Sequence, residues 1–107
     1  MPRYLFIAAY ASEGAKGLLS KGGTARRSTI EKSVSELGGR LESFDFAFGG
    51  DDVYATADLP DHAAAAALAL TVNADGRTRV KTVVLLTPEE VDAAAQRTVS
   101  YQAPGTT

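Results

Sequence analysis

The feature that most constrains the fold is an alternation of apolar residues on both sides of a glycine-rich turn. Apolar residues stand at every second position before and after the turn: Phe44, Phe46 and Phe48, then Val53, Ala55 and Ala57. Between them lies Gly49-Gly50-Asp51-Asp52, a composition typical of a tight chain reversal. The pattern predicts an antiparallel hairpin that supplies the second and third strands.

The turn itself has a structural and a chemical interpretation. Tight turns require positive φ at one or two positions, so we expect it at Gly49 or Gly50, where alanine should then destabilise by roughly 1 kcal/mol or more. We expect Asp52 to cap the turn by accepting backbone N–H bonds. Adjacent carboxylates at Asp51 and Asp52 also bind hard cations in some proteins. Aspartate is so common in turns that we interpret the segment as a register device.

The rest of the chain alternates strand and helix signals. We expect a strand over 4–11, one short helical turn within 12–21, a helix over 24–37 with Thr24 as N-cap, a helix over 60–72, a strand over 77–86 and a helix over 88–96. A brief pairing of 99–101 would precede a fraying end. This order predicts an α+β, ferredoxin-like βαββαβ fold with an extra C-terminal helix. We assign 1–97 to one domain and 98–107 to a partly flexible tail.

Composition excludes several functional classes. The chain has 107 residues, a formal net charge of −2 and 11 scattered basic residues, which argues against nucleic-acid and membrane partners. It has no cysteine and one histidine, His62, so we expect no metal, haem or other cofactor. We find neither a signal-peptide pattern nor an apolar run long enough to span a bilayer, so we expect a cytoplasmic protein.

Apolar residues occur on both faces of the expected first strand. The second strand has phenylalanines on one face, with Leu41 and Ala47 expected on the other. Two helices cover only one sheet face. If about four large apolar side chains on the other face stayed exposed to water, each would lose roughly 1.5–3 kcal/mol of burial free energy. That sum rivals the net stability of a small domain, about 5–15 kcal/mol. We therefore expect a homodimer or a higher even oligomer. The alternative is a monomer whose C-terminal helix covers the second face.

Several segments together resemble the GYD-domain proteins, a bacterial and archaeal family named for a Gly-Tyr-Asp-like turn. They are 4–7, 37–41, 44–49, 58–61, 86–91 and 99–105. The chain has Asp51 where the family's tyrosine is expected, so no tyrosine role transfers, although Gly49 and Asp52 match. The resemblance implies a dimeric α/β barrel. Its wider superfamily includes cofactor-free monooxygenases, lactone isomerases, haem-degrading enzymes and ligand-sensing regulators, so the fold alone implies no single activity.

Candidate site residues each have a structural alternative. Asp45 would act as a general base if it faced a buried surface, but an edge-strand charge facing water explains it as well. Aromatic side chains that combine bulk with, in tyrosine, a polar tip are candidates for lining a ligand pocket: Tyr4, Tyr10, Phe44, Phe46 and Tyr54. Core packing is the alternative for all of them. His62 is interpreted as a surface histidine.

The segment Gly22-Gly23-Thr24-Ala25-Arg26-Arg27 resembles an anion cradle, with glycines, a helix start and two arginines. It lacks a phosphate-loop pattern, so helix capping and solvent-facing charge explain it better. The leading hypothesis is a binding protein for a small apolar molecule, or a cofactor-independent enzyme, with an apolar pocket between sheet and helices. The alternative is a non-enzymatic assembly or ligand-sensing regulatory module. A cavity of roughly 300–1,000 Å³ would favour a ligand site, whereas a water-sized interior would favour the module.

Overall fold

The computed structural model describes residues 1–105. Its elements are, in chain order, β1 (Arg3–Tyr10), α1 (Ser12–Lys21), α2 (Gly23–Glu36), β2 (Arg40–Phe46), β3 (Val53–Asp58), α3 (His62–Asp75), β4 (Thr78–Leu85) and α4 (Pro88–Ala95). The strands form one antiparallel sheet in the order β2-β3-β1-β4. This topology confirms the predicted ferredoxin-like fold with an extra C-terminal helix.

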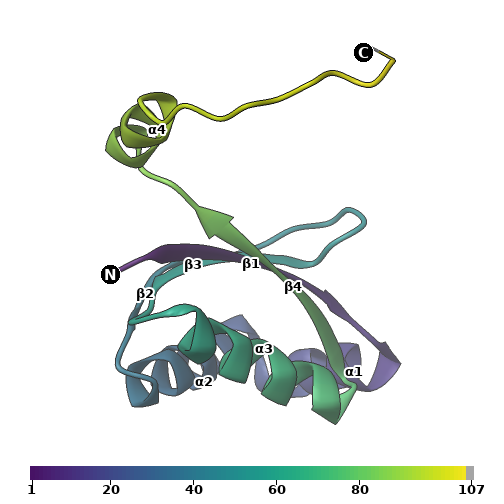
Figure 1. Ribbon diagram of the computed structural model, residues 1–107. Helices are drawn as coiled ribbons and strands as arrows, with labels where there is room; N and C mark the ends of the chain where they lie inside the picture. Colours follow the sequence, from purple (N-terminus) through teal and green to yellow (C-terminus); the bar gives the residue numbers. More distant parts are fainter. Residues whose placement is uncertain (106–107) are drawn as a thin grey trace.

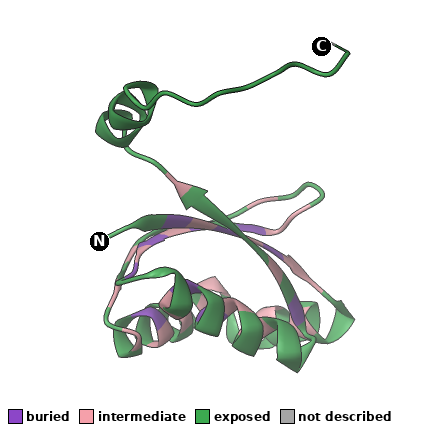
Figure 2. Ribbon diagram, viewed as in Figure 1, coloured by how far each residue is buried: buried purple, intermediate pink, exposed green. Residues whose placement is uncertain are grey.

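The helices lie on opposite sides of the sheet. Figure 1 shows α1, α2 and α3 beneath one face, while α4 and the chain that follows it stand beyond the other. Alternate residues of β1 and β3 point into the helical layer. There they form the core with side chains of α2 and α3: Tyr4, Phe6, Val34, Ala57, Leu59, Ala65 and Leu68. The buried residues in Figure 2 accordingly lie between the sheet and these helices.

Local sequence signals set several helix ends. Asp61 caps α3, because its carboxylate accepts a hydrogen bond from the Ala64 backbone N–H at 2.9 Å. Gly76 ends the same helix in the left-handed region, at φ 84°. Thr87 and Glu90 form a capping box at the start of α4, each side chain accepting the other's backbone N–H.

The start of α2 and the tail differ from the predictions. The short helical turn expected within 12–21 is a full helix, α1, and Gly22 alone separates it from α2. Gly22 has φ 86° and occupies the N-cap position, so Thr24 lies inside the first turn and the prediction of Thr24 as N-cap is wrong. The predicted pairing of 99–101 is also wrong, since these residues form no strand. Two residues of the predicted tail, 106 and 107, lie outside the described part.

A β-bulge corrects the predicted faces of β2. The register shifts between Leu41 and Ser43, so Leu41 pairs with Ala57 and shares a face with Phe44. Strict alternation had placed Leu41 on the opposite face, but it packs against the core. Phe48 lies beyond the end of β2 and is fully exposed. The alternating pattern therefore predicts a longer second strand than the structure has.

The hairpin turn also closes differently from the prediction. Neither Gly49 nor Gly50 has a positive φ, and a Cβ at either would meet nothing within 4 Å. The Ala47 N–H instead donates to the Asp52 carbonyl at 2.8 Å and closes the loop. The Asp52 carboxylate does accept a backbone N–H, but from Tyr10 in β1, at 2.8 Å. Asp52 therefore ties the hairpin to the central strand and does not cap the turn.

The second face of the sheet has no cover within the described chain. By register, its apolar residues come from three strands: Leu5, Ile7 and Ala9, Tyr54, and Val83 and Leu85. Tyr54 and Val83 are each 40% exposed. The residues after β4, 86–105, are called the C-terminal arm below. The arm extends away from the sheet and leaves this face open. Because of this extension, the radius of gyration is 17.2 Å, against about 13 Å for a compact chain of this length.

Candidate functional site

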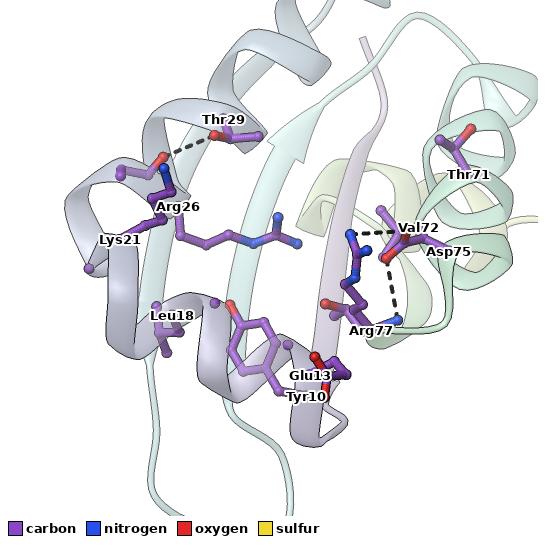
Figure 3. A pocket seen from close by; sticks show the side chains of 15 residues that line it. Tyr10, Glu13, Leu18, Lys21, Arg26, Thr29, Thr71, Val72, Asp75 and Arg77 are labelled. Atoms are coloured by element: carbon purple, nitrogen blue, oxygen red, sulfur yellow. Dashed lines mark hydrogen bonds and ion pairs between the residues drawn. The ribbon is translucent and has the colours of Figure 1, made fainter.

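An open cleft lies between the helices at one end of the sheet. Its volume is about 610 Å³. One wall comes from α1 and the start of α2, the other from the end of α3, and the floor from β1 and β4. The lining residues are Tyr10, Glu13, Gly14, Gly17, Leu18, Lys21, Gly22, Ala25, Arg26, Thr29, Thr71, Val72, Asp75, Arg77 and Thr78. We call this the α1–α3 cleft; Figure 3 shows its labelled side chains.

Glycines shape the α1 wall. A Cβ at Gly14 would overlap the backbone carbonyl of Arg77, so this glycine permits α1 to approach the start of β4. The Ala11 N–H donates to the same carbonyl at 2.9 Å and fixes that approach. Gly17, one turn further along α1, would have nothing within 4 Å of its Cβ. The wall is thus anchored at Gly14 and left without a side chain at Gly17.

Arg26 supplies an unpaired positive charge to the cleft. Its side chain extends from α2 over the ring of Tyr10, with 6.0 Å between the guanidinium carbon and the ring centroid. The Arg26 Nε is buried without a hydrogen-bond partner. Within residues 1–105, its guanidinium takes part in no hydrogen bond or ion pair. A donor buried in this way is an uncompensated polar group.

Of the four other charged residues in the cleft, three have partners, and Lys21, at the end of α1, is exposed and takes part in no ion pair within residues 1–105. Arg77 pairs with Asp75 at 3.5 Å, on the side of the cleft opposite Arg26. Glu13 accepts a hydrogen bond from Lys16 at 3.3 Å, although both side chains are well exposed. The electrostatic character of the interior is therefore set mainly by Arg26.

A smaller, apolar void lies next to the cleft. It has a volume of about 40 Å³ and lies between the sheet and α2. Phe6 and Phe44 line it, while Tyr10 and Arg26 belong to the walls of both cavities. Between sheet and helices there is thus a water-sized apolar interior, and the larger space opens beside it.

Of the predicted ligand-lining residues, the structure brings Tyr10 to the cleft and Phe44 to the void. Phe46 is 38% exposed and packs over Gly23, where a Cβ would lie 2.9 Å from its ring. Tyr4 is 1% exposed within the core. Tyr54 lies on the open sheet face. The five predicted residues therefore lie in different parts of the domain and do not line one pocket.

Asp45 does not lie near the cleft. It pairs in register with Tyr54 on the open sheet face, where it is exposed to solvent. The general-base hypothesis required a buried carboxylate, which this position does not provide. Within residues 1–105, no three histidine, aspartate or glutamate side chains gather in a manner that would hold a metal ion.

His62 has a partner that sequence reasoning missed. Its Nδ1 forms a 2.6 Å hydrogen bond with the Tyr4 hydroxyl, and the two rings meet edge to face with centroids 5.7 Å apart. Burial, followed by the negative charge of Asp61, raises the pKa of Tyr4 above its ordinary value. The pair anchors the start of α3 on β1. No alternation or spacing signal links two residues 58 positions apart.

The comparison with protein families identifies the chain through its whole folded part. The GYD domain model matches residues 4–95, from the beginning of strand β1 to the end of helix α4. The chain belongs to the GYD-domain family. No match was found among curated proteins, and none among solved structures. Family membership confirms the resemblance noted in the sequence and leaves the chemistry to be argued from this domain's own side chains. No helix within residues 1–105 is long and apolar enough to cross a membrane.

Proposed function

We propose that this GYD domain binds a small organic molecule in the α1–α3 cleft. The observation that carries the proposal is the cleft itself, whose volume of about 610 Å³ falls within the range of roughly 300–1,000 Å³ typical of ligand sites. Its lining also combines apolar and polar side chains, as ligand-binding sites usually do. Leu18, Val72 and Tyr10 offer apolar contact, and Arg26 offers a polar one.

Binding is favoured over catalysis by the state of the cleft carboxylates. A general base must lie within hydrogen-bond reach of the proton it removes, and a carboxylate whose oxygen already contacts another donor is less available for that role. The two carboxylates in the cleft, Glu13 and Asp75, each have a basic partner. A cofactor-independent enzyme remains the variant of this proposal in which a bound substrate displaces one of those partners.

The test fills the cleft without disturbing the fold. Gly17→Phe places a ring in the cleft from a helical position that has open space around its Cβ, and it also removes a glycine from a helix. Gly17→Ala is the matched control. A small-molecule fragment mixture should shift the amide resonances of cleft residues in the parent and in Gly17→Ala, but not in Gly17→Phe. Binding that persists in Gly17→Phe, or shifts confined to other surfaces, would refute the cleft as the site.

Self-assembly is a second candidate function, favoured by a separate observation. The open sheet face presents Ile7, Tyr54 and Val83 to water, and each large apolar side chain left wet forfeits roughly 1.5–3 kcal/mol. A second copy of the same face, related by a two-fold axis, would bury both sets at once. We propose a homodimer formed through this face.

The C-terminal arm supports the same proposal. It has at most marginal contact with the other described elements, and Figure 2 shows it exposed throughout. An isolated eight-residue helix such as α4 is marginal in water, so its order requires packing. The arm carries Glu89, Glu90, Asp92 and Arg97, so the whole formal charge of −2 lies in it. Arg79, on the open face, gives a partner's arm complementary charge, while Lys81 beside it is already paired with Asp51 at 3.4 Å.

Light scattering at micromolar concentration tests the assembly. The parent should have the mass of a dimer, or of a higher even oligomer. Val83→Arg, on the open face, should shift the mass toward the monomer. Leu70→Arg is the control, because Leu70 is 71% exposed on α3, on the other side of the sheet. A monomeric parent, or equal effects of the two substitutions, would refute assembly through this face.

A further inference from the structure

We infer that the ligand of the α1–α3 cleft is a small carboxylic acid, whose carboxylate binds the guanidinium of Arg26. The inference rests on the proposed function and adds the chemical class of the ligand. Its basis is a cation that the domain itself leaves without a counter-charge. The arginine lies in the wall of the cleft, and its Nε is buried and unpartnered.

The position of Arg26 is unfavourable without an anion. Taking a guanidinium partly out of water is compensated when its donors meet acceptors, and a buried donor left alone forfeits that compensation. No carboxylate among residues 1–105 lies within 4.0 Å of Arg26, whereas Arg77, across the cleft, has Asp75. The partly enclosed arginine is therefore the one left uncompensated. A bound carboxylate would supply acceptors in the planar, paired geometry that guanidinium donors match.

Charge balance selects a monoanion. The cleft walls contain three basic residues and two acidic ones: Lys21, Arg26 and Arg77, with Glu13 and Asp75. Arg77 pairs with Asp75, and Glu13 pairs with Lys16, so Lys21 and Arg26 are the two cations of the walls without an acidic partner. Lys21 is exposed to solvent, whereas Arg26 is partly buried. A single negative charge neutralises Arg26, while a dianion would meet excess repulsion from the two carboxylates.

The surroundings of Arg26 fix the orientation of such a ligand. The Tyr10 ring lies beside the guanidinium, at 6.0 Å from the ring centroid to the guanidinium carbon, and this cation–π contact restrains it in the wall of the cleft. Leu18 and Val72 stand on opposite walls and offer apolar contact to the rest of the molecule. The ligand that fits is an acid with a compact apolar body, its carboxylate directed at Arg26.

Two matched probes separate charge from shape. Phenylacetate and phenylacetamide have nearly the same shape, and only the first is an anion. Titration of the amide resonances of Gly14, Gly17 and Gly22 reports binding in the cleft. For the full chain, we expect phenylacetate to bind at least about tenfold more tightly than phenylacetamide, as hydrogen bonds to charged groups are stronger than neutral ones.

Arg26→Gln should remove that preference, weakening phenylacetate about tenfold or more and leaving phenylacetamide unchanged. Arg27→Gln is the matched control, because Arg27 is the exposed neighbour on the same helix. Arg26→Lys keeps the charge without the planar fork and should retain an intermediate preference. It also serves as the test variant if Arg26→Gln fails to fold.

The failures of the two proposals are distinguishable. If both probes shift the cleft resonances equally, or if Arg26→Gln and Arg27→Gln behave alike, the acid inference is wrong and cleft binding stands. If neither probe shifts these resonances in the parent, and the fragment mixture also fails to do so, both proposals are wrong. A preference for the acid that disappears in Arg26→Gln and persists in Arg27→Gln supports the inference.

Discussion

Two glycines that look equivalent in the sequence should respond oppositely to alanine. Gly39 lies in the α2–β2 connection, where a Cβ would overlap the carbonyl oxygen of Asp58 and lie 2.6 Å from the Leu59 Cδ2. Leu59 is fully buried, so neither neighbour can move into solvent. Gly49, in the hairpin turn, has no positive φ and open space where a Cβ would be. We predict that Gly39→Ala destabilises the domain and that Gly49→Ala does not.

The magnitude follows from the atoms that must move. Relieving the overlap at Gly39 separates the start of β2 from the end of β3, which strains the pairing of Arg40 with Asp58 and the packing of Leu59. Forcing extra volume into a packed site typically costs about 1–3 kcal/mol. A backbone oxygen can move less than a side chain can, so we expect a destabilisation in the upper part of this range, about 2–3 kcal/mol. Gly49→Ala should be neutral or stabilise by up to about 1 kcal/mol, because alanine restricts the unfolded chain.

Thermal unfolding followed by circular dichroism measures both variants against the parent. For a domain of this size, 1 kcal/mol shifts Tm by about 4–8 °C, so Gly39→Ala should melt about 8–24 °C below the parent. Gly49→Ala should melt at or slightly above the parent temperature. Equal losses in the two variants would show that the hairpin glycine carries a conformational requirement, and the reasoning from the turn geometry would be refuted.

Two further predictions concern aspartates. Asp52→Ala should destabilise by about 1.5–3 kcal/mol, because it removes the acceptor of the Tyr10 N–H, and Asp52→Asn should have a smaller effect. Faster hydrogen exchange of the Tyr10 amide in the alanine variant is the diagnostic measurement, and unchanged exchange would contradict the role given to Asp52. At Asp58, burial raises the pKa, but hydrogen bonds with Glu42 and Arg3 and the charges of Arg3 and Arg40 outweigh it and lower the pKa below its ordinary value. The stability this adds is present above the unfolded pKa of about 3.9 and is lost as pH falls through the folded one. The free energies of unfolding in urea of the parent and Asp58→Asn should therefore differ at pH 7 and converge below pH about 3. A difference that stays constant with pH would refute this contribution of Asp58.

The order of elements was predictable because it depends on local signals. The Asp61 cap, the Gly76 stop and the Thr87–Glu90 capping box act within a few residues, so such helix ends depend on nearby sequence alone. Alternation was reliable only where strand pairing is regular. The bulge between Leu41 and Ser43 is set by pairing with β3, and no periodicity within β2 contains that information.

The cleft was less predictable because distant segments create it. Its long wall requires α1 to be a full helix held against the backbone of Arg77, a residue more than sixty positions away, and Gly14 makes that approach possible. The segment 22–27 resembles an anion cradle but lacks a phosphate-loop pattern, and the sequence does not tell which of its two arginines faces inward. The helix turns Arg26 over Tyr10 and leaves Arg27 in solvent. Tyr10 is in turn held through its N–H by Asp52 of the hairpin. The motif that carries the family resemblance and the cation that carries the ligand proposal are therefore joined by one hydrogen bond and one ring contact.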